Sequence, residues 1–270
     1  MDAADVPEQL RGRYQDWSWS LVQRHPGEVA VWRLERLAGR ARDLRYLKVA
    51  VASRFPRVLD EGARMRWARL YLPVPEVVHC ASDGRVDWLV TGALPGRPAS
   101  DELLQGEPER LVVLLAEGLG RFHAAPVERC PFNFAVDTAI GHAEARVQAG
   151  LVDPSQDFHP EHADLGPHDA IAALRWLRPA VDTDDLVVCH GDYCLPNVLV
   201  CGTGGGMVAS GFVDVGELGV ADRWWDLAVA TWSLDWNLGP GWEELFLRAY
   251  GVDRDSDRVA FYRLLYDVVS

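Results

Sequence analysis

The sequence predicts an α+β protein, with a five-stranded antiparallel sheet and one main helix in its N-terminal part and mostly helices after it. Two patterns indicate this class: short runs rich in apolar and β-branched residues fill the first third of the chain, and helical spacing dominates after residue 100. A stretch rich in glycine and proline, residues 92–96, separates the two patterns. Because such stretches join domains, we expect two lobes, 1–91 and 97–270, with a hinge at 92–96.

Five segments of the first lobe have the composition of strands. They cover residues 17–22, 28–34, 44–51, 76–80 and 87–91. The first two flank the turn from Gln23 to Gly27, which predicts a hairpin. A helical stretch beginning at Glu61 follows the third strand, and the prolines of Leu72 to Pro75 end it.

Three segments of the second lobe have helical spacing. The apolar face from Leu111 to Phe122 predicts a buried helix, and residues 140–151 and 169–177 predict amphipathic ones. Residues 153–167, between the last two, contain histidines and acids, but their spacing matches no metal-ligand pattern. We expect this segment to be a solvated loop.

Length and charge limit the classes of function. A chain of 270 residues that is 49% hydrophobic can bury a large core. Its net charge of −13 argues against a nucleic-acid or anionic-membrane partner. The odd number of cysteines, without metal-binding spacing, predicts reduced thiols, and neither a signal segment nor a membrane-spanning run is present. We expect a cytoplasmic monomer or dimer that binds a small molecule.

A polar run, His190 to Asn197, follows a short apolar run that predicts a strand. A second apolar run, Gly211 to Gly216, predicts a strand that carries one acid, Asp214. A carboxylate in an apolar strand is costly unless a cation compensates it. We therefore expect the polar loop and the second strand to lie side by side, so that Asp192, Asn197 and Asp214 converge.

Two carboxylates and an amide carbonyl suit Mg²⁺ and the transfer of phosphoryl groups. In this interpretation Asp192 is the catalytic residue that accepts the proton of an attacking hydroxyl, and Asn197 and Asp214 are the metal ligands. The structural alternative is a polar turn after a strand, with Asp214 capped or paired. We expect His190 to hydrogen-bond its own loop.

The run HGDYCLPN, the stretch GFVDVGELGVADRWWDLA and the closing FYRLL resemble the aminoglycoside 3′-phosphotransferases, which share a bilobal fold with protein kinases. The resemblance covers nearly the whole chain. It implies a protein-kinase-like fold in which 1–91 binds the nucleotide and 97–270 carries catalysis and acceptor binding. The implied cofactors are ATP, with GTP as the alternative, and Mg²⁺. Asp222 and Asp226 are expected to cap and brace the backbone around the catalytic loop.

The resemblance also assigns nucleotide-binding residues. Lys48 lies in the third predicted strand and Glu61 in the next helix, and kinases use such a pair to hold the α and β phosphates. The resemblance places the phosphate loop at Gly27, although that segment alone reads as an ordinary hairpin turn. The hinge would present the Gly92 carbonyl and the Leu94 amide to adenine. Thr91 would line the pocket behind.

The chain departs from the family pattern in the acceptor region. Trp232 stands where the family commonly has Arg, Trp236 where it has an acid, and Tyr266 where an Asp is usual. The expected acceptor-binding residues are Asp157, Glu161, Trp232, Trp236, Tyr266 and Asp267. Aromatic residues in place of acids favour a ligand with stacking faces and few charges. The alternative is that the tryptophans, four residues apart, belong to the core of one helix.

The predicted function is nucleotide-dependent phosphorylation of a hydroxyl on a sugar-containing antibiotic, which confers resistance. The family resemblance indicates an aminoglycoside substrate. A weakly charged nucleoside antibiotic of the capuramycin type, recognised by Trp232 and Trp236, is the first alternative. A nucleotide-binding pseudokinase is the second, and the presence of Asp192, Asn197 and Asp214 argues against it.

Overall fold

The chain folds into two compact units in a computed structural model. The structure describes residues 6–25, 29–38, 41–53 and 57–269. The first unit comprises Met1–Pro95 and Ser210–Gly216, and the second comprises Gly96–Ala209 and Glu217–Ser270. The chain therefore returns to the first unit for a short segment before it completes the second.

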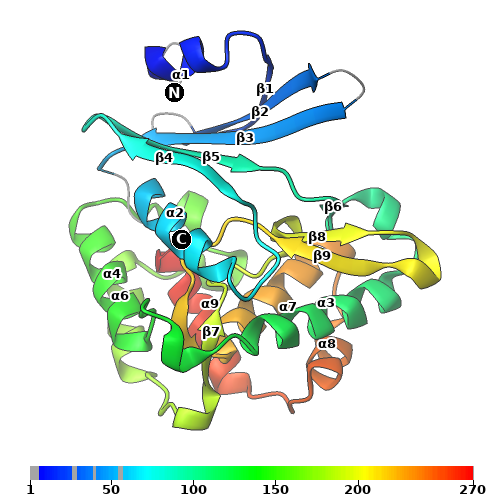
Figure 1. The fold of residues 1–270 in the computed structure, drawn as a ribbon. Coiled ribbons are helices and arrows are strands. Elements are labelled where there is room, and N and C mark those ends of the chain that lie inside the picture. The colour runs from blue at the N-terminus through cyan, green and yellow to red at the C-terminus, as the bar shows by residue number, and fades with distance from the viewer. Residues whose placement is uncertain (1–5, 26–28, 39–40, 54–56, 270) are drawn as a thin grey trace. The chain divides into compact units, whose positions relative to one another are not determined.

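The first unit is built on a five-stranded antiparallel sheet, as predicted. Its strands are β1 (Ser18–His25), β2 (Val29–Ala38), β3 (Ala41–Val51), β4 (Val77–Ser82) and β5 (Val86–Gly92). They lie in the order β1-β2-β3-β5-β4 (Figure 1). β2 and β3 extend further than the apolar pattern predicted, because charged pairs continue their ladder. Arg36 faces Asp43 across the two strands, with their side chains 3.4 Å apart.

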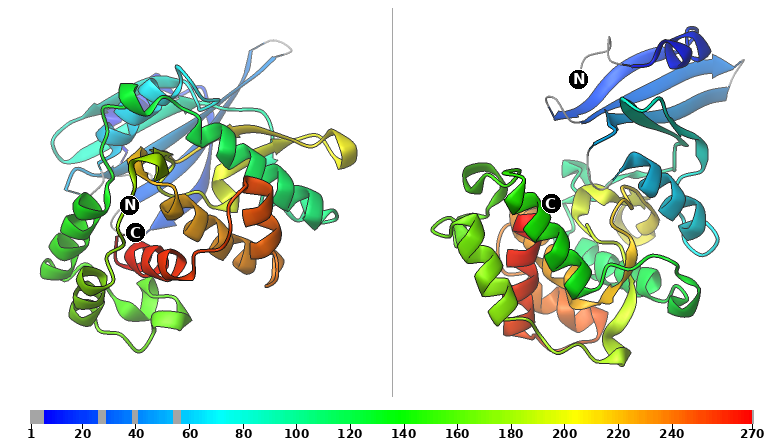
Figure 2. Two further views of the ribbon diagram at one scale, coloured as in Figure 1. Left: turned by 90° about the horizontal axis from the view of Figure 1, so that it is seen from below. Right: turned by 90° about the vertical axis from the view of Figure 1, so that its left-hand side faces the viewer.

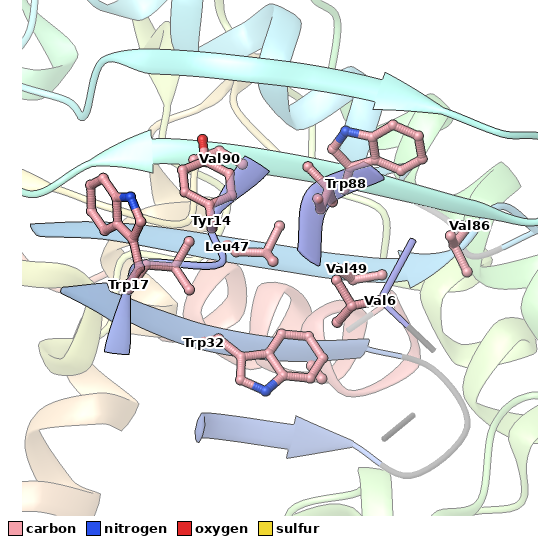
Figure 3. Close-up of a cluster of buried hydrophobic side chains, with 12 residues drawn as sticks. Val6, Tyr14, Trp17, Trp32, Leu47, Val49, Val86, Trp88 and Val90 are labelled. Carbon is pink, nitrogen blue, oxygen red and sulfur yellow. The ribbon is translucent and has the colours of Figure 1, made fainter. Parts of the chain in front are cut away.

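One face of this sheet carries an aromatic core that includes the N-terminal helix α1 (Glu8–Arg13). Leu10, Tyr14 and Trp17 pack there with Trp32 and Trp88 of the strands, and all five side chains are buried (Figure 3). No pattern in the sequence predicted α1. A helix of six residues, mostly charged or polar, is too short to display a helical period.

Helix α2 (Val58–Ala68) packs against β3, β4 and β5. Gly62 permits this close approach, because a Cβ at that position would lie 2.6 Å from Sγ of Cys80 and 3.5 Å from Leu89. The helix begins one turn before the predicted start at Glu61. Glu61 therefore lies within the helix and is buried against the sheet.

The second unit is mostly helical, as predicted. Its α-helices are α3 (Pro108–His123), α4 (Val136–Gln148), α5 (Pro154–Asp157), α6 (Pro167–Trp176), α7 (Trp224–Leu238), α8 (Glu243–Tyr250) and α9 (Ser256–Val269). Single 3₁₀ turns lie at Glu102–Leu104, Val127–Arg129, Pro160–His162, Thr183–Asp185, Leu195–Asn197 and Gly204–Gly206. Helix α9, red in Figure 2, packs against α7 and α4, and α3 packs against α8. None of the helices described is long and apolar enough to cross a membrane.

Short strands frame the polar loop of the second unit. β7 (Leu186–Cys189) pairs antiparallel with β10 (Gly219–Asp222), and a three-stranded sheet has the order β6 (Arg97–Pro98), β8 (Val198–Cys201), β9 (Val208–Phe212). β7 is the strand that the sequence predicted before the loop. The strand predicted at residues 211–216 is wrong in position, because β9 ends at Phe212.

Candidate active site

The loop after β7 is fixed by its main chain. Asp226 of α7 accepts the N–H of His190 at 2.6 Å on Oδ2 and the N–H of Gly191 at 2.9 Å on Oδ1. Gly191 has φ of 90°, and a Cβ there would lie 2.4 Å from Cβ of Glu217. This turn therefore requires glycine. The predicted bracing by Asp226 is confirmed, and Asp222 caps α7 by accepting the N–H of Trp224 at 3.0 Å.

Asp192 and Asn197 lie together on this loop. Nδ2 of Asn197 donates to Oδ2 of Asp192 at 2.8 Å and to the main-chain oxygen of Asp192 at 3.0 Å. Because the amide nitrogen is used in this way, the carbonyl oxygen is the atom of Asn197 that could bind a metal ion. The second carboxylate oxygen of Asp192, Oδ1, accepts the hydroxyl of Tyr266 from α9 at 2.9 Å. The family pattern predicted Tyr266 in the acceptor site, but no sequence pattern predicted this contact.

His190 supports the loop from within. Its ring is fully buried, and Nδ1 accepts the N–H of Asp192 at 3.3 Å. Phe122 and Tyr193 pack against the ring, with centroid distances of 5.3 and 5.9 Å. The predicted loop-bonding role of His190 is confirmed.

Lys48, Glu61 and Asp214 form a charged cluster in the first unit. Nζ of Lys48 lies 2.8 Å from Oε2 of Glu61 and 2.8 Å from Oδ1 of Asp214. Burial alone would lower the pKa of Lys48, but the charges of Asp214 and then Glu61 raise that pKa well above its usual value. Lys48 is therefore cationic at neutral pH.

Asp214 does not lie in a strand, and that expectation is wrong. It follows the end of β9 by two residues, its side chain is 47% exposed, and its φ of 56° is in the left-handed region. The apolar pattern around it has another cause, because Phe212 and Val215 are buried without being paired as one continuous strand. Asp tolerates the left-handed region better than most residues, and such an outlier is typical of functional sites.

The predicted hinge residues lie at the end of β5. Thr91 is buried in the strand, and the N–H of Gly92 donates to the main-chain oxygen of Glu76 at 2.9 Å. Leu94 packs against Gly211, where a Cβ would lie 2.5 Å from Cδ1 of the leucine. Gly27, the expected phosphate-loop residue, lies outside the described residues.

Trp232 lies in the core, as the structural alternative expected, and its ring does not reach the surface. It is 1% exposed. His159 packs on it with ring centroids 4.5 Å apart, and the guanidinium of Arg263 lies 5.3 Å from its ring centroid. The first eleven residues of α7 are all buried, so a spacing of four could not tell a ligand-facing ring from a core ring.

Trp236, one turn further along α7, is 50% exposed. Its ring lies 5.4 Å from that of Trp232 and 6.0 Å from that of His159. Trp236 therefore offers a half-exposed aromatic ring that contacts two further rings.

The acids expected to bind the acceptor differ in their exposure and in their partners within the protein. Asp267 is 4% exposed, and its Oδ2 accepts the N–H of His159 at 3.0 Å and lies 2.7 Å from Nδ1 of His162, so this carboxylate binds groups within the protein. Glu161 is 53% exposed and lies 4.0 Å from the Arg263 guanidinium. Asp157 accepts the N–H of Asp153 at 2.7 Å.

Residues 153–167 are thus not simply a solvated loop. The two histidines attach this segment to α9 through Asp267 and to α7 through Trp232. In the chain, Asp267 lies 108 residues from His159 and 105 residues from His162. No local spacing could have revealed them.

Comparison with known proteins agrees with this geometry. The model of the phosphotransferase enzyme family matches residues 36–262. An aminoglycoside 3′-phosphotransferase of Streptomyces fradiae is 36% identical over 95% of this chain and 97% of its own length. The crystal structure of an aminoglycoside 3′-phosphotransferase of type VIII has a TM-score of 0.87 and 35% identity, covering 98% of each chain. An aminoglycoside phosphotransferase of Streptomyces rimosus, in complex with ADP and streptomycin, has a TM-score of 0.79 and 26% identity, covering 100% of this chain and 99% of its own. The chain belongs to the aminoglycoside 3′-phosphotransferase family of phosphotransferase enzymes.

Proposed function

We propose that this phosphotransferase transfers the γ-phosphoryl group of ATP to a hydroxyl of a sugar-containing antibiotic and so inactivates it. The observation that carries the proposal is the loop of Asp192 and Asn197. Its carboxylate is oriented by a side-chain amide at 2.8 Å, and its backbone is fixed by Asp226. A preorganised carboxylate of this kind suits removal of a proton from an attacking hydroxyl.

Asp192 would accept the acceptor proton on a carboxylate oxygen while the hydroxyl oxygen attacks phosphorus. The hydrogen bond from Asn197 keeps that carboxylate in one orientation, so little reorganisation is needed when the acceptor arrives. We assign catalysis and acceptor binding to the second unit on this basis.

The first unit would hold the nucleotide. Lys48, kept cationic and oriented by Glu61, would contact the phosphates, as the lysine of kinases does. Thr91, the carbonyl of Gly92 and the amide of Leu94 would contact adenine. Gly27 would approach the phosphates, and residues 92–96 would act as the hinge. The ADP bound by the Streptomyces rimosus relative supports a nucleotide cofactor.

Mg²⁺ is the metal that the available ligands fit. The carbonyl oxygen of Asn197 and the carboxylate of Asp214 are hard oxygen ligands. When bound, Mg²⁺ would neutralise charge on the nucleotide phosphates. Lys48 occupies Oδ1 of Asp214 at 2.8 Å, so this lysine also holds the carboxylate in position.

The names of the relatives support an aminoglycoside as the acceptor. The exposed carboxylate of Glu161, with Asp157 on the same segment, would pair with its amines. A second candidate, a weakly charged nucleoside antibiotic, is favoured by Trp236, whose half-exposed ring lies beside the tilted rings of His159 and Trp232. Stacking on such a ring requires no charge on the ligand.

A panel assay tests the proposal. The purified protein is incubated with Mg²⁺, either ATP or GTP, and amine-rich or amine-poor antibiotics, and mass spectrometry detects phosphorylated products. We expect one class to gain a single phosphate. Binding of an amine-rich acceptor should weaken as salt is added, whereas stacking on Trp236 should be nearly insensitive to salt. Nucleotide binding without transfer to any acceptor would contradict the proposal and indicate a pseudokinase.

Two variants separate the proposed roles. Asp192→Ala should lower turnover by several orders of magnitude and leave nucleotide affinity nearly unchanged, because Asp192 acts on the acceptor. Asp214→Ala should instead abolish the effect of Mg²⁺ on nucleotide affinity. Calorimetric titration with nucleotide, with and without Mg²⁺, measures both, and an equal loss of affinity in the two variants would contradict this division.

A further inference from the structure

The hydroxyl of Tyr266 stands where an acceptor hydroxyl would be expected. It donates to Oδ1 of Asp192 at 2.9 Å, while Oδ2 of the same carboxylate accepts the amide of Asn197. An alcohol acceptor must donate its proton to this carboxylate, so Tyr266 presents the same chemical group to the same base. Tyr266 does not itself have to be phosphorylated for this hydrogen bond to affect the reaction.

Helix α9 holds Tyr266 in this position. One turn earlier, the hydroxyl of Tyr262 donates to Oδ2 of Asp222 at 2.9 Å in the interior. The next residue, Asp267, is bound by His159 and His162. Because Tyr262 and Asp267 both have buried polar partners, the backbone of α9 is held in place beside the loop that carries Asp192.

The Tyr266 phenol also stays protonated. Burial raises its pKa well above the usual value, and the charges of Asp192, Cys194 and Glu217 raise it further. The Tyr266 hydroxyl is therefore a hydrogen-bond donor at neutral pH.

We propose that Tyr266 is a positioning residue that acts through Asp192, and that its hydroxyl protects the catalytic carboxylate from water until an acceptor binds. The inference rests on the proposed role of Asp192 as the base. A carboxylate oxygen has two lone-pair sites, and Tyr266 takes one of them on Oδ1. An acceptor that is bound through its sugar rings can compete with the Tyr266 hydroxyl for Oδ1, whereas a free water molecule lacks that binding energy.

The reaction that Tyr266 suppresses is hydrolysis of the nucleotide. In it, a water oxygen attacks the γ-phosphorus, its proton passes to Asp192, and the bond from phosphorus to the bridging oxygen breaks. The products are a nucleoside diphosphate and inorganic phosphate, and the proton on Asp192 is released to solvent. This reaction uses the same base and the same nucleotide as transfer, so an exposed base would waste nucleotide.

The test compares two tyrosines of one helix. Tyr266→Phe removes the hydroxyl on Asp192, and Tyr262→Phe removes an equivalent hydroxyl on Asp222, away from the loop. Diphosphate release is measured with ATP and Mg²⁺ without acceptor, and transfer is measured with the best acceptor of the panel. We expect Tyr266→Phe to raise acceptor-free hydrolysis about fivefold, since one hydrogen bond to the base is lost, and Tyr262→Phe to leave it unchanged.

Tyr266→Ala, which also opens the space of the ring, should raise hydrolysis further. In Asp192→Asn/Tyr266→Phe the increase should disappear, because the water reaction needs the base. Hydrolysis that stays at the wild-type rate in Tyr266→Phe, falls in parallel with transfer, or persists without Asp192 would overturn the inference while leaving the proposed function intact. A wild-type protein that transfers phosphate to no acceptor would overturn both.

Discussion

Nε2 of His123 lies 3.0 Å from Oδ2 of Asp226, the oxygen that also accepts the N–H of His190. Nδ1 of the same histidine lies 2.7 Å from the hydroxyl of Tyr250. A single buried carboxylate therefore connects α3, α7 and the catalytic loop, and through His123 it reaches α8. These contacts fix the catalytic loop to the interior of the second unit.

Asp226→Ala should accordingly destabilise the protein by about 3 kcal/mol or more, because two buried main-chain N–H groups and His123 lose their acceptor. Asp226→Asn, which keeps one oxygen, should cost less. Urea unfolding of both variants measures the difference. A loss below about 1 kcal/mol in Asp226→Ala would show that water replaces the carboxylate.

Lys48 and Glu61 should behave as one unit. Lys48→Met should lower kcat/KM by about two orders of magnitude, since one positioned cation is lost, and Glu61→Gln should lower it less. Because Glu61 acts through Lys48, the double variant should be no worse than Lys48→Met alone. Steady-state kinetics of the four proteins give the coupling energy, and strictly additive losses would exclude coupling.

Substitution of two tryptophans of α7 should have different effects, on stability at Trp232 and on acceptor binding at Trp236. Trp232→Ala removes a buried ring and should cost about 3–5 kcal/mol of unfolding free energy. Trp236→Ala removes a half-exposed ring and should change stability by under about 1 kcal/mol, while it raises the acceptor KM about tenfold. Thermal melting and acceptor kinetics distinguish them. An unchanged acceptor KM in Trp236→Ala would remove this ring from the acceptor site.

We expect the ionisation of Tyr250 to lower the stability of the protein at alkaline pH. Burial raises the pKa of Tyr250 to about 12 in the folded protein, above about 10 for an unfolded chain. Between these values the folded state keeps a proton that the unfolded state has lost, so this contribution is complete below pH 10 and declines as the pH rises toward 12.

The wild-type protein should therefore lose about 1 kcal/mol more between pH 9 and 11 than Tyr250→Phe does. Urea unfolding at these pH values measures the difference in slope. Tyr250→Phe also removes the hydrogen bond to His123, but that loss lowers the free energy of unfolding equally at both pH values. Parallel pH profiles for the two proteins would contradict the raised pKa.

Local pattern was sufficient for the strands and for the motif of the loop. Alternating apolar residues located all five strands, and the Asp192 to Asn197 spacing brought together two groups that lie 2.8 Å apart. The strand ends were missed where charged pairs such as Arg36 and Asp43 continue the ladder. Apolar periodicity cannot detect such an extension.

The features that were not predicted depend on tertiary contacts, which the spacing of residues in the sequence does not reveal. The apolar run around Asp214 looked like a strand because Val215 is buried, although the backbone turns there. Trp232 and Trp236 share one helix face, yet only the second is exposed. Tyr266 and Asp192 are 74 residues apart, and only the packing of α9 shows that they meet.

The return of Ser210–Gly216 to the first unit means that this unit is not encoded by one continuous stretch of the gene. The N–H of Phe212 donates to the main-chain oxygen of Pro73 at 2.9 Å, Gly211 packs against Leu94, and Asp214 binds Lys48. A fragment cut at Pro95 would lack all three contacts and would carry Lys48 without one of its two carboxylates. The nucleotide-binding half is thus unsuited to expression as an isolated domain or to exchange by simple N-terminal fusion. A chimaera that transplants it would need the seven residues of this return segment from the same parent.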